Sequence, residues 1–144
     1  MKQIYILLIA LLMGLSANAE DSGTCGANLK WHLTDDGVLT ITGKGEMYDY
    51  SNRGPWGSSI KRVIIGDSVT TIGYSAFAGC SSLTSVTIPN SITTIGYSAF
   101  FDCSSLTSVL IPNSVTTIGK EAFYYCIYNH RTTKTNQKYP SVNL

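Results

Sequence analysis

The sequence predicts a β-rich solenoid, a stack of 23-residue coils behind an N-terminal β-hairpin cap. Three observations predict it: a repeat of fixed period, apolar positions that recur in register, and turn-forming residues that bound each extended stretch. A fixed period of this length is typical of stacked supersecondary units, in which each unit covers the apolar edge of its neighbour.

The repeat occupies residues 63–126. Residues 63–85 read VIIGDSVTTIGYSAFAGCSSLTS, residues 86–108 read VTIPNSITTIGYSAFFDCSSLTS, and residues 109–126 read VLIPNSVTTIGKEAFYYC. Five apolar positions recur: Val63/Val86/Val109, Ile65/Ile88/Ile111, Val69/Ile92/Val115, Ile72/Ile95/Ile118 and Phe77/Phe100/Phe123. The period therefore predicts three leucine-containing coils, of which the last is incomplete.

Each coil is expected to begin with a short strand. In the second copy, Val86 and Ile88 flank Thr87, so the two apolar side chains share one face and the threonine points away. Pro89 ends this strand, because proline has no N–H to donate to a ladder.

The rest of the coil is expected to turn back toward the next strand. A second extended piece carries Ile92 and Ile95 inward, and Gly96 offers a turn position with positive φ. The stretch from Ala99 to Cys103 is expected to form a single helical turn.

The cysteines at 23-residue spacing belong to the repeat. In coils stacked about 4.8 Å apart, their sulfurs would remain well beyond the roughly 2.05 Å of a disulfide bond. We therefore expect Cys80, Cys103 and Cys126 to pack as buried thiols. The alternative is a disulfide that includes Cys25, whose place in the fold the sequence does not give.

Residues 20–62 lie outside the period and are predicted to form an N-terminal β cap. Leu29, Trp31 and Leu33 alternate with polar residues, and a second apolar stretch follows the Asp-Asp-Gly sequence at 35–37, which is typical of a hairpin turn. Residues 43–59 are rich in Gly, Ser, Tyr and Asn and are expected to cover the first coil.

Residues 1–19 are predicted to be a signal peptide. Lys2 precedes an apolar run over 4–15, and Ala17 and Ala19 fit the small-x-small cleavage pattern. The run is shorter than the roughly 18–20 apolar residues of a membrane span. We therefore expect an exported protein, secreted or held at the cell surface, with no membrane span after cleavage.

Charge argues against a nucleic-acid partner. The chain has 10 basic and 9 acidic residues, and removal of Lys2 with the signal peptide leaves nine of each. A nucleic-acid-binding domain usually carries a basic excess. Residues 127–144 are predicted to be an aperiodic basic tail, because they contain Arg131, Lys134 and Lys138 and no acid.

The segment from Cys80 to Cys103 reads CSSLTSVTIPNSITTIGYSAFFDC and closely resembles the BspA-like, or Treponema pallidum-type, leucine-rich repeat. Residues 25–31, 35–41 and 47–56 resemble the segment that often precedes these repeats in bacterial surface proteins. The resemblance implies a leucine-rich repeat solenoid with a protein-binding or adhesion role and no cofactor. It also implies a protein or glycan ligand, such as a host matrix protein.

The third coil departs from the family pattern, because Cys126 is followed by Ile-Tyr-Asn instead of Ser-Ser-Leu. One interpretation is a truncated structural module of a longer surface protein without independent activity. The other is an end that a partner covers. Ile111, Ile118 and Phe123 have no following coil to cover them, so we expect self-association through the C-terminal coil.

Catalysis finds little support in the sequence. A secreted hydrolase that uses His32 with Asp35 or Asp36 is the alternative, and its test is activity that survives His32→Ala. The chain has no G-x-S-x-G, H-E-x-x-H or phosphate-loop motif, and its cysteines lack C-x-x-C spacing. We expect neither an enzyme nor a metal site.

The candidate binding surface comes from positions where the copies differ. Exposed aromatic residues are common interface anchors, and the positions that precede each repeat cysteine vary from Ala-Gly to Phe-Asp and Tyr-Tyr. The candidate residues are Tyr97, Phe101, Asp102, Tyr124 and Tyr125. Rows of threonine, such as Thr70/Thr93/Thr116 and Thr71/Thr94/Thr117, are interpreted as strand-forming residues.

The cleavage pattern predicts a cut between Ala19 and Glu20. N-terminal sequencing of the exported protein should therefore begin with Glu-Asp-Ser. An exported form that still begins at Met1 would show that the signal-peptide interpretation is wrong.

Overall fold

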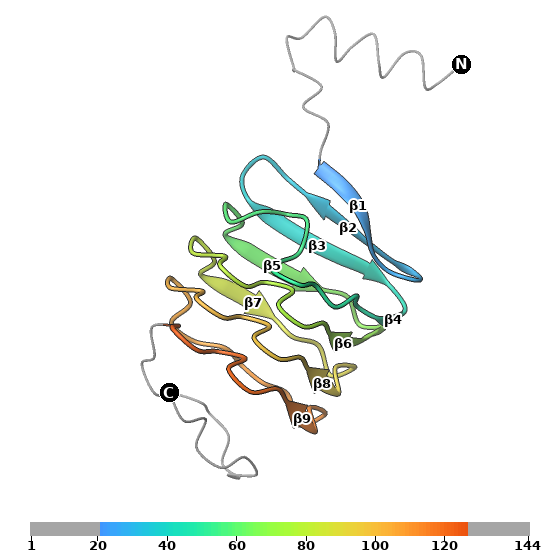
Figure 1. Cartoon of the computed structure of the whole chain (residues 1–144). Helices are drawn as coiled ribbons and strands as arrows, with labels where there is room; N and C mark the ends of the chain where they lie inside the picture. The colour runs from blue at the N-terminus through green and yellow to red at the C-terminus, as the bar shows by residue number, and fades with distance from the viewer. Residues whose placement is uncertain (1–20, 127–144) are drawn as a thin grey trace, which may run out of the picture.

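The computed structural model describes residues 21–126 as a stack of coils that runs from β1 at one end to β9 at the other (Figure 1). The strands form a five-stranded sheet in the order β1-β2-β3-β5-β7 and a four-stranded sheet in the order β4-β6-β8-β9. The strands are β1 (Asp21–Gly26), β2 (Leu29–Leu33), β3 (Val38–Gly43), β4 (Gly45–Glu46), β5 (Arg62–Ile65), β6 (Val69–Ile72), β7 (Ser85–Thr87), β8 (Thr94–Ile95) and β9 (Thr117–Ile118). This arrangement confirms the predicted β-rich solenoid with a hairpin cap.

The cap is a three-stranded antiparallel unit. β1 pairs with β2, and β2 pairs with β3 across the predicted turn. Gly37 takes a positive φ of 87° in this turn, and its N–H donates to the carbonyl of Thr34 at 3.0 Å. The cap buries Trp31 and Leu39 against the first coil.

The solenoid begins one coil earlier than the 23-residue period indicates. β3 pairs in parallel with β5, with Leu39 opposite Val63, and β4 pairs in parallel with β6, with Gly45 opposite Val69. Residues 38–61 of the predicted cap segment therefore form a first coil, so the stack has four coils where the period predicted three. We call residues 51–58 of this first coil the cap loop. The period misses this coil because its registers are offset by 24 residues and its aromatic residue is Trp56.

One aromatic column runs through the centre of the stack. Trp56 stacks on Phe77 with ring centroids 5.2 Å apart, Phe77 on Phe100 at 5.1 Å, and Phe100 on Phe123 at 5.2 Å. None of the four side chains is more than 3% exposed. Trp31 meets the end of this column edge-on, 6.0 Å from Trp56, so the cap and the coils share one core.

The strand faces agree with the predicted alternation. Ile92 and Ile95 are fully buried, whereas Thr87 is exposed. The role predicted for Gly96 is wrong, since Gly96 is not among the residues with positive φ. Glycine is needed there for close approach, because a Cβ would lie 2.8 Å from the carbonyl carbon of Gly73 in the preceding coil.

The predicted helical turn is also wrong, because the described chain contains no helix and this stretch is an arc of successive turns. Alternate N–H groups of the arc bond within the coil and between coils. Ala78 donates to Ser75 at 3.1 Å within the coil, whereas Phe77 donates to Ala99 of the next coil at 2.7 Å. A helix would direct its N–H groups to its own carbonyls and leave none to join the coils.

The repeat cysteines are thiols that bond between coils. The sulfur of Cys103 donates to the carbonyl of Phe77 at 3.1 Å, and that of Cys126 to Phe100 at 3.2 Å. Burial raises the pKa of the Cys80 thiol to about 12 and that of Cys25, which lies in β1, to about 11. All four cysteines are free thiols, so the alternative disulfide with Cys25 is absent. Cys80 and Cys103 are buried as predicted, whereas Cys126 is only partly buried.

The last described coil is less completely covered than the coil before it. Ile88 is 8% exposed and Ile95 is buried, whereas their equivalents Ile111 and Ile118 are only partly buried. Phe123 remains 3% exposed. The predicted signal peptide and basic tail lie outside the described residues, and the predicted self-association stays a prediction.

The aromatic column predicts which substitutions destabilise the fold. We expect Phe100→Ala to lower the free energy of unfolding by about 3–5 kcal/mol, because the deletion leaves a cavity between two stacked rings. Thr94→Ala, at a partly exposed position, should change it by about 0.5 kcal/mol or less. Urea unfolding followed by circular dichroism measures both free energies. Equal losses of stability in the two variants would contradict the central role of the aromatic column.

Candidate binding surface

The arcs of the coils and the loop of the cap enclose a shallow, open groove of about 640 Å³. The cap contributes Ser51, Asn52, Arg53 and Ser58, and the arcs contribute Ser75, Ala78, Gly79, Ser81, Tyr97, Ser98, Phe101, Asp102 and Glu121. Three of the five candidate residues, Tyr97, Phe101 and Asp102, therefore line one groove.

The arc positions these side chains through two left-handed backbone positions in each coil. The first row is Ser75, Ser98 and Glu121, with φ of 52°, 51° and 59°, and the second row is Gly79, Asp102 and Tyr125, with φ of 70°, 54° and 60°. Only glycine takes this conformation without strain, and for other residues it costs about 1–2 kcal/mol. In the second row, Asp102 of the third coil and Tyr125 of the fourth coil therefore carry strain. The second coil avoids this strain because it has Gly79 there.

Phe101, Tyr124 and Tyr125 form a surface group that we call the aromatic cluster. The rings of Phe101 and Tyr124 are stacked with centroids 5.8 Å apart, and Tyr125 stands edge-on to both, 5.5 Å from Phe101 and 4.2 Å from Tyr124. Tyr125 is 62% exposed. The cluster lies beside the groove and shares Phe101 with it.

The tyrosines of the aromatic cluster add polar groups to it. A side-chain hydrogen bond with Tyr125 is the main cause that raises the pKa of Tyr124 above its usual value. The tyrosine hydroxyls can donate and accept hydrogen bonds at the rim of an apolar surface.

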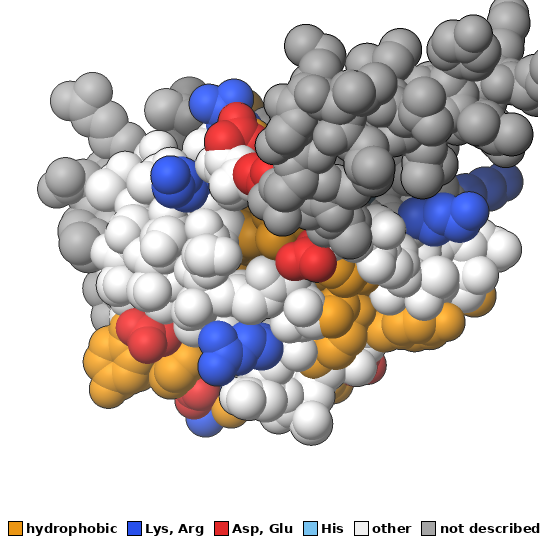
Figure 2. All heavy atoms as spheres, turned by 90° about the horizontal axis from the view of Figure 1, so that it is seen from above, with side chains coloured by type: hydrophobic (Ala, Val, Ile, Leu, Met, Phe, Trp, Pro, Cys, Tyr) orange, Lys and Arg blue, Asp and Glu red, His pale blue; other side chains and the backbone are white. Residues whose placement is uncertain are grey.

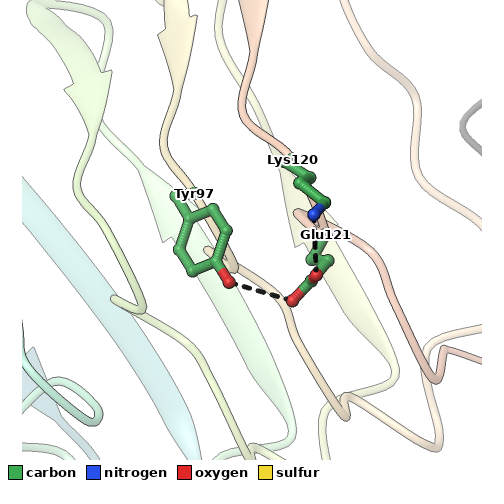
Figure 3. Close-up of polar contacts among 3 residues, drawn as sticks. All are labelled: Tyr97, Lys120 and Glu121. Atoms are coloured by element: carbon green, nitrogen blue, oxygen red, sulfur yellow. Dashed lines mark hydrogen bonds and ion pairs between the residues drawn. The ribbon is translucent and has the colours of Figure 1, made fainter.

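Tyr97 is held at the other side of the groove by a polar chain of contacts, shown in Figure 3. Its hydroxyl donates to Oε2 of Glu121 at 3.0 Å, and Nζ of Lys120 lies 3.7 Å from Oε1 of the same carboxylate. Lys120 and Glu121 occupy the positions of Tyr97 and Ser98 in the next coil. The third copy of the repeat thus supplies the groups that orient the tyrosine of the second.

The charges around the groove are mixed. Arg53 comes from the cap, and Asp102 and Glu121 come from the arcs. Figure 2 shows the same mixture on the face seen from above, where Lys and Arg side chains lie among Asp and Glu side chains. The surface therefore lacks the single-sign field that long-range attraction of a highly charged polymer requires.

The threonine rows carry out a structural role. The hydroxyl of Thr93 donates to the carbonyl of Thr70 at 3.3 Å, and that of Thr116 to the carbonyl of Thr93 at 3.2 Å. These hydroxyls join successive coils and reinforce the backbone ladder.

The structure places His32 on β2, opposite Thr40 of β3, and Asp36 in the hairpin turn, where its carboxylate accepts a hydrogen bond from Thr34. His32 lines neither the groove nor the smaller hollow formed by residues of β1, β2 and β3. Across residues 21–126, no three His, Cys, Asp or Glu side chains are grouped so that they could hold a metal ion. Within the same range, no helix is long and apolar enough to cross a membrane.

Sequence reasoning missed ten of the thirteen residues that line the groove, among them Ser51, Asn52, Arg53 and Glu121. The first three lie in the cap loop, whose fold the 23-residue period does not describe. Glu121 carried a signal, because it replaces the serine of the two preceding copies.

A stack of parallel β coils joined by turn arcs, with variable side chains on the arcs, defines a leucine-rich repeat solenoid. The family described as BspA type Leucine rich repeat region, in 6 copies, matches residues 56–140. The chain belongs to this BspA-type leucine-rich repeat family. The comparison with curated proteins finds no significant match.

Two crystal structures of leucine-rich repeat proteins have similar folds. The protein from Eubacterium ventriosum is 30% identical with a TM-score of 0.60, and the match covers 75% of this chain and 37% of that one. The protein from Bacteroides capillosus is 21% identical with a TM-score of 0.54, over 72% of this chain and 92% of that one. The chain thus spans little more than a third of the Eubacterium protein and nearly all of the Bacteroides protein.

The left-handed positions predict that glycine is tolerated in the arc. We expect Tyr125→Gly to keep the free energy of unfolding within about 1 kcal/mol of the parent, because removal of the strain of φ 60° offsets the lost ring contacts with Phe101 and Tyr124. Asp102→Gly should raise it by a few tenths of a kcal/mol at most, since a short polar side chain tolerates this region and glycine adds freedom to the unfolded chain.

The control is Ala78→Gly, at an arc position that does not have positive φ, and it should destabilise slightly. Urea unfolding of the three variants measures the differences. A Tyr125→Gly protein several kcal/mol less stable than the parent would contradict backbone strain at Tyr125.

Proposed function

We propose that the mature chain is an exported protein-binding or adhesion module that acts at the cell surface or after secretion, without catalysis. The predicted signal peptide and membership of the BspA-type family support this role. The observation that carries the proposal is the aromatic cluster, a preassembled group of three rings on the variable edge of the solenoid.

The aromatic cluster has the properties of an interface anchor. Tyrosine and phenylalanine are enriched among the residues that dominate binding energy, because they bury a large area with few rotatable bonds. The rings of Phe101, Tyr124 and Tyr125 already contact one another, so little side-chain freedom is lost on association. The tyrosine hydroxyls suit a partner that offers backbone carbonyls, and the ligand is therefore a protein.

The rigid scaffold supports recognition by surface shape. Backbone and side-chain hydrogen bonds join the coils through the described stack. The arcs are therefore held in place before a ligand binds. Preorganised surfaces bind with a smaller entropy loss than mobile loops. We place the ligand across the arcs of the last two coils, over Tyr97, Phe101, Asp102, Tyr124 and Tyr125.

The test is binding of the mature chain to a panel of purified matrix proteins, namely fibronectin, fibrinogen, laminin and collagen, measured by biolayer interferometry. We expect a specific interaction with at least one of them. The double substitution Tyr124→Ser with Tyr125→Gly should weaken it at least tenfold, which corresponds to about 1.4 kcal/mol. Urea unfolding of the double variant, measured beside the parent, separates a loss of binding from a loss of folding.

The matched control is Leu110→Ser, since Leu110 is a 69% exposed apolar residue outside both the aromatic cluster and the groove. This variant should bind as the parent does. Failure of the parent to bind any of the four proteins, or equal binding by the double variant, would reject the aromatic cluster as the ligand surface.

A further inference from the structure

The groove beside the aromatic cluster has a lining unlike that of a protein interface. Seven of its thirteen lining residues are Ser, Asn or Arg, two are acidic and two are aromatic. The core of a protein interface is depleted in charged and serine residues. The volume of about 640 Å³ lies within the range of small-ligand sites, which is about 300–1,000 Å³.

We propose that this groove binds a neutral oligosaccharide. A pyranose presents two kinds of surface: hydroxyl groups around its rim, each both a donor and an acceptor, and a face of C–H groups that packs against an aromatic ring. The groove offers partners for both, since Asn52, Arg53 and Asp102 present planar polar groups and Tyr97 and Phe101 present rings. The inference goes beyond the protein-binding role, and the groove shares Tyr97, Phe101 and Asp102 with the surface proposed for the protein ligand.

The planar groups match the geometry of adjacent sugar hydroxyls. An amide such as Asn52 presents one acceptor and two donor hydrogens, and a carboxylate such as Asp102 accepts two hydrogen bonds side by side. Both side chains are exposed and line the groove, Asn52 from the cap loop and Asp102 from the third coil. Serine hydroxyls of the lining, including Ser75 and Ser81, add further donors and acceptors.

The charges of the groove favour a neutral sugar over an anionic one. Asp102 and Glu121 contribute two negative charges, which Arg53 and the Lys120 ammonium, 3.7 Å from the Glu121 carboxylate, balance. A sulfated or sialylated glycan would place its own negative charge beside both carboxylates, which costs binding energy. A neutral ligand meets no such repulsion and uses all three groups as hydrogen-bond partners.

The aromatic wall is fixed before the ligand arrives. Tyr97, which is 44% exposed, is oriented by its hydrogen bond to Glu121, and Phe101 is stacked on Tyr124. Rings that are already held in place need little reorganisation when a ligand binds. This saving matters for sugars, because each hydrogen bond that a sugar makes to the protein replaces one that it made to water.

The test is saturation-transfer difference NMR on the mature chain with a panel of defined neutral oligosaccharides: N-acetyllactosamine, chitobiose, mannotriose and cellobiose. Sialyllactose and a sulfated heparin tetrasaccharide form the anionic arm. We expect saturation transfer to at least one neutral sugar and none to the anionic ones. The sugar that binds distinguishes a host-type glycan from a cell-wall or plant-type glycan.

Two substitutions place the site. Asp102→Gly and Asn52→Ala should each raise the dissociation constant for the bound sugar at least tenfold. Asp102→Gly should do so without making the protein less stable. Leu110→Ser is the matched surface control and should leave the constant unchanged. Absence of transfer to every neutral sugar, stronger binding of the anionic sugars, or full binding by Asp102→Gly would each overturn the inference.

A third variant separates the groove from the protein-binding surface. Tyr125 lies in the aromatic cluster but does not line the groove. Tyr125→Gly should therefore keep its affinity for the sugar within about twofold while it weakens binding to the protein ligand. Loss of sugar binding in this variant would show that the aromatic cluster, and not the groove, holds the sugar.

Discussion

The hydrogen bonds between successive coils are the constraint on which the rest of the structure depends. They join strand to strand, as at Ile72 and Ile95, and arc to arc, as at Phe77 and Ala99. Coils held at the spacing of β-strands place equivalent residues directly over one another. An interior side chain therefore packs mainly against its own counterpart, and the same residue type is favoured in every coil.

This constraint explains where the chain is uniform and where it varies. The interior phenylalanines stack ring on ring through the last three coils, and the sulfur and threonine rows bond to carbonyls of the preceding coil. Side chains on the outside of the arc touch neither row, so nothing in the stack requires them to repeat. The substitutions from Ala78 to Phe101 and Tyr124 lie there, and the candidate surfaces consist of these departures.

The same logic sets how much the sequence could predict. The repeat predicted the solenoid, the buried faces and the phenylalanine column, because each residue has a counterpart at the same position in the other copies. It did not give the first coil, where Trp56 stands in for phenylalanine, nor the reason for Gly96, which is the backbone of the preceding coil. The variable positions led to Tyr97, Phe101 and Asp102, but the opposite wall of the groove comes from an aperiodic loop.

The origin of the two walls has a consequence for specificity. The aromatic cluster is made only of arc positions, so any coil with suitable residues at these positions could continue it. The groove also needs Asn52 and Arg53 of the cap loop, which has no equivalent elsewhere in the described chain. A surface made of arcs alone becomes larger as coils are added. A surface that includes the cap loop can form at one place only, and its shape does not depend on the coils that follow. The cap thus does more than cover the core: it converts a repeating edge into a single, defined site.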